Sequence, residues 1–261
     1  MQLHIEIKSN GFTLRGMLHK PEQIIDKVPM VIFFHGFMNN KCEHYFSFVE
    51  TSRELEKLGI ASIRFDFMGS GESDGTFEEM SVETEIRDGL SILRYAQSLN
   101  WVDRGRIALA GMSFGGLVAS VVAGRMPEEV KALCLWAPAA IAVRDAKQGH
   151  AGDTDISDAL TTGIADLKGY RIGKRFIEDT RVLDYNTEIK PYKNNVLLIW
   201  GENDFIVPQD IVREYDNIYG KRLYKHMIKG VGHMFETLDA REEKLELTLH
   251  FLEKELLIRP I

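Results

Sequence analysis

Cysteine and long apolar runs are both scarce in this sequence, and each shortage narrows the class of protein. Two of the 261 residues are cysteines, and Cys134 lies in an apolar stretch, so no disulfide framework is expected. No run approaches the roughly 20 apolar residues that cross a bilayer. The N-terminus alternates polar and apolar residues and lacks the regions of a signal peptide. We therefore expect a cytoplasmic protein that does not enter a membrane.

The sequence also has fewer basic than acidic residues. The chain has 32 Lys and Arg against 39 Asp and Glu, a net charge of −7, and the basic residues are scattered. This pattern argues against a nucleic-acid partner and against attraction to anionic membranes. No His/Cys cluster has metal-ligand spacing, and the glycines of residues 69–75 miss the dinucleotide-loop spacing by one residue. We expect neither a metal nor a cofactor.

Apolar strand patterns alternate with helical patterns along most of the chain. Its length of 261 residues predicts a single domain over residues 1–261. Continuous apolar strands joined by helices predict an α/β fold with a mostly parallel sheet and helices on both faces. Residues 2–8 and 12–19 alternate in polarity and should form an antiparallel edge. In the last helix, a stripe of leucines predicts the face toward the core: Leu245, Leu249, Leu252 and Leu256. The six predicted core strands are residues 28–34, 60–65, 106–110, 131–136, 196–200 and 223–228.

Residues 139–190 interrupt this alternation of strand and helix patterns. They contain no strong strand, several Gly and Asp residues, and short helical patterns such as residues 172–177. Long insertions in compact domains usually serve a function, so we predict a cap over the active site. The alternative is a mobile surface excursion without a catalytic role.

The most informative motif is Gly-Met-Ser-Phe-Gly-Gly at residues 111–116. It follows an apolar strand and opens an apolar helical stretch, which is the context of a nucleophile elbow. Glycines two residues on either side of Ser113 remove the Cβ atoms that so tight a turn cannot accommodate. Ser113 is therefore the predicted nucleophile.

A serine needs a base to take its proton and an acid to orient that base. In chains with this elbow the order is Ser, then Asp or Glu, then His. Asp204 follows one predicted strand and His233 follows the last, and both lie where parallel sheets build their sites. The alternatives are a helix-capping role for Asp204, the neighbouring Glu202 as the acid, and a merely structural role for His233.

Ester hydrolysis also needs donors for the oxyanion of its tetrahedral intermediate. We predict the backbone N–H of Phe114, at a helix N-terminus, and that of Phe37, in His-Gly-Phe-Met at the end of a strand. His35 is expected to brace this loop by hydrogen bonding rather than to act in catalysis.

These segments together resemble the α/β-hydrolases over essentially the full length, and in particular the small bacterial cinnamoyl (feruloyl) esterases. The resemblance is carried by residues 35–37, 64–75 and 136–140 together with the elbow. It implies an α/β-hydrolase fold, the triad Ser113, Asp204 and His233, and a cap that shapes an aromatic-acyl pocket. It further implies Asp145 and Tyr170 as candidates for binding phenolic hydroxyls. Phe114 departs from the family, in which many members have Gln at that position.

The leading hypothesis is a serine carboxylesterase acting through an acyl-enzyme on small to medium acyl or aryl esters, including hydroxycinnamates. Its partner would be a small-molecule ester, and the sequence leaves a homodimer open. A second hypothesis keeps the triad but makes the protein a peptidase or amidase. A third is a non-catalytic binding module on a hydrolase scaffold.

Overall fold

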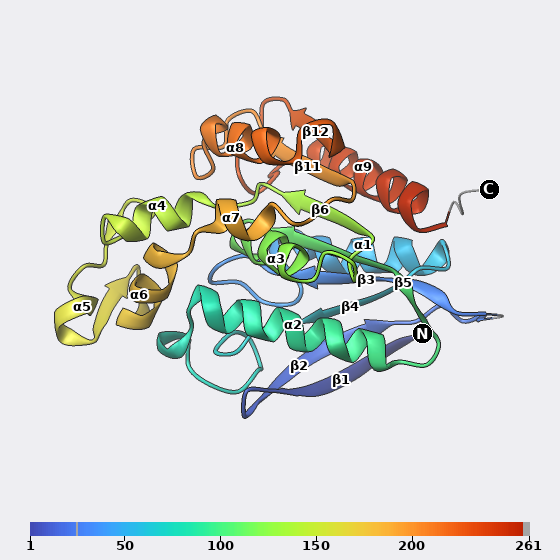
Figure 1. Cartoon of the computed structure of the whole chain (residues 1–261), viewed down its shortest axis with the longest axis horizontal. Helices are drawn as coiled ribbons and strands as arrows, with labels where there is room; N and C mark the ends of the chain where they lie inside the picture. Colours follow the sequence, from blue (N-terminus) through green and yellow to red (C-terminus); the bar gives the residue numbers. More distant parts are fainter. Residues whose placement is uncertain (25, 258–261) are drawn as a thin grey trace.

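The computed structural model describes residues 1–24 and 26–257, and one eight-stranded sheet runs through them. The strand order is β1-β2-β4-β3-β5-β6-β11-β12 (Figure 1). The strands are β1 (Gln2–Ser9), β2 (Phe12–His19), β3 (Val28–Phe34), β4 (Ala61–Phe65), β5 (Val102–Met112), β6 (Ala132–Trp136), β11 (Val196–Gly201) and β12 (Leu223–Ile228).

The sheet is parallel from β4 to β12, while β1 and β2 pair antiparallel at one edge. Both features were predicted from the apolar runs and from the alternating N-terminus. The inner strands are buried along nearly their whole length, because helices cover both faces. All carboxyl ends of the parallel strands therefore meet at one edge of the sheet.

Helices α1 and α9 cover one face of the sheet, and α2, α3 and α8 cover the other (Figure 1). The main helices are α1 (Ser47–Lys57), α2 (Val82–Ser98), α3 (Phe114–Arg125), α8 (Gln209–Tyr219) and α9 (Leu238–Leu257), with short 3-10 turns at His44–Phe46, Phe77–Glu79 and Gly220–Arg222. In the described part of the chain, no helix has both the length and the apolar character to cross a membrane.

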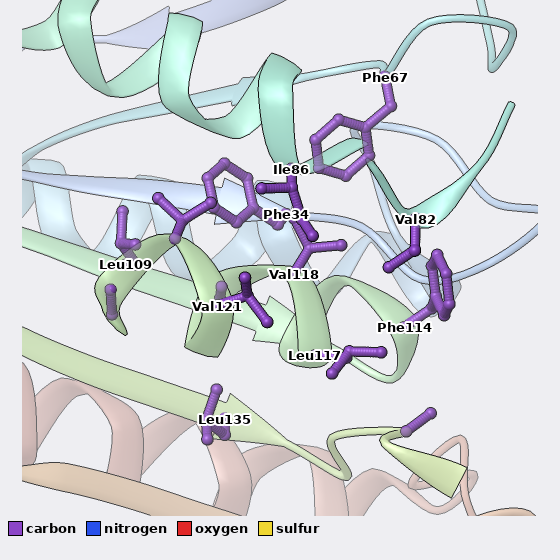
Figure 2. Packing of buried hydrophobic residues seen from close by; sticks show 14 of the residues in the cluster. Phe34, Phe67, Val82, Ile86, Leu109, Phe114, Leu117, Val118, Val121 and Leu135 are labelled. Atoms are coloured by element: carbon purple, nitrogen blue, oxygen red, sulfur yellow. The ribbon is translucent and has the colours of Figure 1, made fainter. Parts of the chain in front are cut away.

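Alternate residues of each strand enter the two cores. In β3, Val31 and Phe33 face the α1/α9 side, whereas Ile32 and Phe34 face the α2/α3 side. Figure 2 shows Phe34 packed with side chains of α2 and α3. Because both cores are closely filled, the loops at the carboxyl edge rest on a rigid base.

Two acidic side chains interrupt the apolar face of α2. The carboxylate of Asp88 accepts the Ser9 hydroxyl at 2.6 Å and the Met68 backbone N–H at 2.9 Å. It thus ties α2 to the end of β1 and to the loop after β4. Burial raises the pKa of Asp88 to about 6 and raises that of Glu85 well above its usual range.

The predicted insertion lies between β6 and β11 and forms a lobe beyond the carboxyl edge of the sheet (Figure 1). One part of the prediction is wrong. The helix expected over residues 172–177 begins two residues later, because Tyr170–Gly173 is a strand and α6 begins at Lys174. The insertion contains α4 (Ile141–Lys147), β7 (His150–Ala151), β8 (Thr154–Asp155), α5 (Ala159–Thr162), β9 (Ile164–Leu167), β10 (Tyr170–Gly173) and α6 (Lys174–Val182), followed by α7 (Tyr185–Ile189), which lies beside α3.

Candidate active site

Ser113 occupies a strained corner between β5 and α3. Its φ of 53° lies in the left-handed region, which is costly for a residue with a Cβ atom. Neighbouring glycines make the turn sterically feasible. A Cβ on Gly115 would lie 2.2 Å from the carbonyl oxygen of Phe34, and one on Gly111 would lie 2.3 Å from that of Gly115. The corner lifts the serine hydroxyl above the carboxyl edge.

Ser113, His233 and Asp204 converge from three loops. The Nε2 atom of His233 lies 2.8 Å from the Ser113 Oγ, and its Nδ1 lies 2.8 Å from the Asp204 Oδ2. The side chains of His233 and Asp204 are only 4% and 1% exposed. This geometry gives a hydroxyl with a base in hydrogen-bond contact and a buried carboxylate that orients the base.

The loop after β11 fixes the carboxylate of Asp204. Its second oxygen, Oδ1, accepts the backbone N–H groups of Ile206 and Val207 at 2.9 and 2.8 Å. Glu202, the alternative acid, is exposed and accepts the N–H of Gly230 instead. The structure therefore presents Asp204 to the histidine and turns Glu202 away from it.

The acid and histidine loops approach closely at a pair of glycines. A Cβ on Gly201, at the end of β11, would lie 2.4 Å from the carbonyl oxygen of Gly232. Only hydrogen fits there, so Gly201 lets the two loops come together. This contact accounts for the glycine at the end of β11.

The two predicted oxyanion donors lie next to the nucleophile. Among the hydrogen bonds of residues 1–24 and 26–257, neither the Phe37 nor the Phe114 backbone N–H has a protein acceptor. Phe114 opens α3, where the N–H groups are unpaired and the helix dipole is positive.

His35 braces the loop that carries Phe37. Its Nδ1 donates to the Gly36 carbonyl at 2.9 Å, and its Nε2 accepts the Phe67 N–H at 3.1 Å. Burial lowers the pKa of His35, which favours the neutral ring that this pair of bonds requires. The structure thus gives His35 the bracing contacts that the sequence suggested.

A cavity of about 490 Å³ opens onto Ser113 and His233, a size suited to a small organic ligand. Its walls are mainly apolar and come from the core loops and from the insertion. The core loops contribute Phe37, Met38, Phe114, Phe205, Ile206, Pro208 and Met234, and the insertion contributes Ile141, Ala142, Asp145, His150, Leu167, Lys168 and Phe176 among others.

Three phenylalanines join the insertion to the oxyanion loops. The ring of Phe176, on α6, lies 5.1 Å from that of Phe37 and 5.9 Å from that of Phe114, centroid to centroid. The rings of Phe37 and Phe114 are 5.5 Å apart. These tilted contacts are favourable aromatic geometry and form one apolar wall of the cavity. Phe176 was not predicted as a site residue, because nothing in its local sequence marks its contact with Phe37.

The two candidate hydroxyl-binding residues have different positions. Asp145 lines the cavity from α4, half-buried, and burial raises the pKa of its carboxyl. Tyr170 does not line the cavity. It is 44% exposed and its ring lies against Phe77, centroid to centroid at 5.2 Å. The structure therefore does not place Tyr170 beside Asp145 in the pocket.

Sequence reasoning also missed two polar side chains of the cavity. His150 and Lys168 reach it from two short hairpins of the insertion, and Lys168 pairs with Asp153 at 2.7 Å. Such short strands leave almost no periodic signal in a sequence. Among the described residues, no group of three or more His, Cys, Asp or Glu side chains could hold a metal ion.

Comparison with known proteins identifies the family of the chain. The profile of the family described as serine aminopeptidase, S33, matches residues 26–161, which is just over half of the chain. The chain belongs to this family of α/β-hydrolases. The expected fold class is thereby confirmed. The match includes Ser113 and ends before the acid and the histidine.

This chain spans less than two thirds of the length of the curated relatives that it matches. An Escherichia coli protein described as an uncharacterized 31.7 kDa protein in the traX–finO intergenic region is 29% identical over 185 residues, 70% of this chain and 62% of that protein. The mouse (Mus musculus) mitochondrial palmitoyl-protein thioesterase ABHD10 is 37% identical over 114 residues, 44% of this chain and 36% of that protein.

A solved structure matches this chain along nearly its whole length. Est1E from Butyrivibrio proteoclasticus with bound ferulic acid superposes with a TM-score of 0.89 at 25% identity. The match covers 97% of this chain and 100% of the other. The similarity therefore extends over the central sheet and the insertion alike.

Proposed function

We propose that this hydrolase is a serine carboxylesterase that cleaves small to medium acyl or aryl esters through an acyl-enzyme. The observation that carries the proposal is the hydrogen-bonded chain Ser113–His233–Asp204, with 2.8 Å at both links. It ends in a cavity whose walls are largely apolar. A nucleophile, a base, an orienting acid and two free N–H donors are the parts that acyl transfer needs.

In the proposed mechanism, the Ser113 Oγ attacks the ester carbonyl while His233 Nε2 takes the hydroxyl proton. Asp204 stabilises the resulting imidazolium. The oxyanion accepts the N–H groups of Phe37 and Phe114. When the intermediate collapses, Nε2 gives the proton to the leaving alcohol and the acyl group stays on Ser113. Water, deprotonated by His233, then attacks the acyl-enzyme. Nε2 returns the proton to the Ser113 Oγ as the acyl–oxygen bond breaks and the acid is released.

Aromatic acyl groups are the favoured substrates within this proposal. The apolar wall of Phe37, Phe114 and Phe176 offers flat surfaces for an aryl ring. Asp145 would accept a hydroxyl on that ring. The ferulic acid bound to Est1E, on a closely similar fold, supports a hydroxycinnamate ester as one candidate. The absence of Tyr170 from the pocket means that any second phenol contact must come from another residue.

The test combines Ser113→Ala with a panel of p-nitrophenyl esters and methyl hydroxycinnamates. We expect turnover by the native chain and a loss of roughly 10⁴-fold or more in kcat for the variant. A fluorophosphonate probe should label the native chain and spare the variant. Unchanged turnover in Ser113→Ala would refute the mechanism. A folded native chain without labelling would instead support the non-catalytic binding module.

An aminopeptidase is the second candidate, favoured by the description of the family itself. The Asp145 carboxylate in the cavity could pair with the free ammonium of a peptide substrate. Aminoacyl p-nitroanilides assayed beside aryl esters separate the two functions. The esterase proposal expects a much larger kcat/KM for the esters, and the opposite ranking would favour the peptidase.

A further inference from the structure

The direction of the Phe37 N–H is set by the peptide that carries it. In a trans peptide the carbonyl and the N–H point in opposite directions, so fixing one fixes the other. The Gly36 carbonyl accepts His35 Nδ1 at 2.9 Å and the Asn39 N–H at 3.2 Å. Gly36 itself is held between Ser113 and Glu43: a Cβ there would lie 3.4 Å from the Ser113 Cβ and 3.5 Å from the Glu43 Oε2.

Glu43 is the buried carboxylate around which this loop folds. It is 5% exposed and adopts a left-handed φ of 59°, unusual for a residue with a side chain. Its Oε2 accepts the Gly36 N–H at 2.7 Å, and its Oε1 accepts the Asn39 side-chain amide and the His44 N–H. Three N–H donors on one carboxylate fix both ends of the loop.

The charge of this carboxylate acts on a buried lysine of α9. Lys244 is 4% exposed, and its Nζ lies 4.1 Å from the ring centroid of Trp136 and 4.6 Å from that of Phe235. Burial lowers the pKa of Lys244 to about 8, and the charge of Glu43 is the largest influence that raises it. The ammonium group lies against two aromatic faces, which favour a cation.

We propose that Glu43 is a positioning residue of the oxyanion hole, and that Lys244 is its buried counter-charge. The carboxylate holds Gly36 so that the next N–H, that of Phe37, faces the cavity. Lys244 offsets the cost of burying that carboxylate beside the loop. The proposal rests on the proposed esterase function, and it adds two residues that do not touch the reacting atoms.

The decisive variant is Glu43→Gln. A glutamine has only one acceptor oxygen, so its NH₂ must face at least one of the three N–H donors. We expect kcat for an aryl ester to fall by about tenfold to hundredfold, less than the loss of a whole oxyanion donor. The affinity for an aryl trifluoromethyl ketone, whose serine adduct carries the oxyanion, should fall by a similar factor. KM should stay near the native value.

Glu50→Gln is the matched control. Glu50 pairs with Arg241 across the same α1–α9 contact at 2.9 Å, but it makes no bond to the loop. We expect native kcat and inhibitor affinity in this variant. A loss as large as that of Glu43→Gln would show that loosening α1 from α9 is enough, and would overturn the proposal.

Lys244→Met serves as the second variant, and also decides the outcome if Glu43→Gln does not fold. Methionine fills the space between the rings without the charge, and kcat and ketone affinity should fall together with KM unchanged. The proposal is overturned if folded Glu43→Gln keeps the native kcat and ketone affinity. If Glu43→Gln does not fold, the same result in Lys244→Met overturns it. A Ser113→Ala variant that keeps its turnover would instead refute the esterase function itself.

Discussion

Replacing Asp88 by Asn should change how the stability of this protein depends on pH. Asp88 is 2% exposed and accepts the Ser9 hydroxyl and the Met68 N–H. An asparagine can keep both contacts: its oxygen accepts the Met68 N–H, and its NH₂ donates to the serine oxygen once that hydroxyl rotates. The substitution therefore removes a titratable group with little change in shape.

The size of the effect follows from the pKa of Asp88, raised by burial from 3.8 to about 6. Between these two values the folded chain binds the proton more tightly than the unfolded chain. The free energy of unfolding contributed by this group therefore falls as the pH rises through the window. A difference of about two pKa units corresponds to about 3 kcal/mol, which is an upper limit for one buried carboxyl.

Urea unfolding of both proteins at several pH values between 4 and 7.5 measures this effect. The Asp88→Asn variant should gain stability relative to the native chain as the pH rises, by up to about 3 kcal/mol. Asp74→Asn is a control without this effect, because the hydrogen bond from Arg15 lowers the pKa of Asp74 and places its titration below the range of the assay. The difference between that variant and the native chain should stay nearly constant from pH 4 to 7.5. A pH-independent difference between native and Asp88→Asn would refute the reasoning.

Three further substitutions test the site. Asp204→Asn keeps the two backbone donors but presents the wrong hydrogen-bonding group to the histidine, so kcat should fall by about 10³- to 10⁴-fold in an ester assay. Gly115→Ala should lower the free energy of unfolding in urea by about 3 kcal/mol, because its Cβ would meet backbone atoms at 2.2 Å. Gly105→Ala is the control and should be near neutral, because its nearest contact would be at 3.5 Å. Phe176→Ala should lower stability by about 3–5 kcal/mol and raise KM for aryl esters, and an unchanged KM would exclude its ring from acyl binding.

The sheet and the converging site residues could be predicted because local signals carry them. Strands such as residues 132–136 are buried on both faces and read as continuous apolar runs. The glycines around Ser113 mark a turn that no other residue could make. Asp204 and His233 each follow a parallel strand, and the topology brings such positions to one edge. None of these inferences required a long-range contact to be known.

The features that could not be predicted from the sequence depend on contacts between residues that are distant along the chain. Helix α9 shows why: its leucine stripe predicted the inner face, yet the structure buries Lys244 and Thr248 there and leaves Leu245 and Leu249 half-buried. A lysine is placed in a core only when partners far away in the sequence, here Trp136 and Phe235, surround it. The hairpins of the insertion were missed for the same reason, since strands of two to four residues depend on their neighbours rather than on propensity.

The insertion departs from the sheet after β6 and returns at β11, and these two strands are direct neighbours. Its entrance and exit are thus side by side, while Ser113 precedes it and Asp204 and His233 follow it. The triad and the insertion that covers the cavity are therefore encoded by separate segments of the chain. We expect the insertion to be exchangeable: replacing residues 139–190 by the corresponding segment of another family member should transfer its acyl preference and leave Ser113, Asp204 and His233 in place.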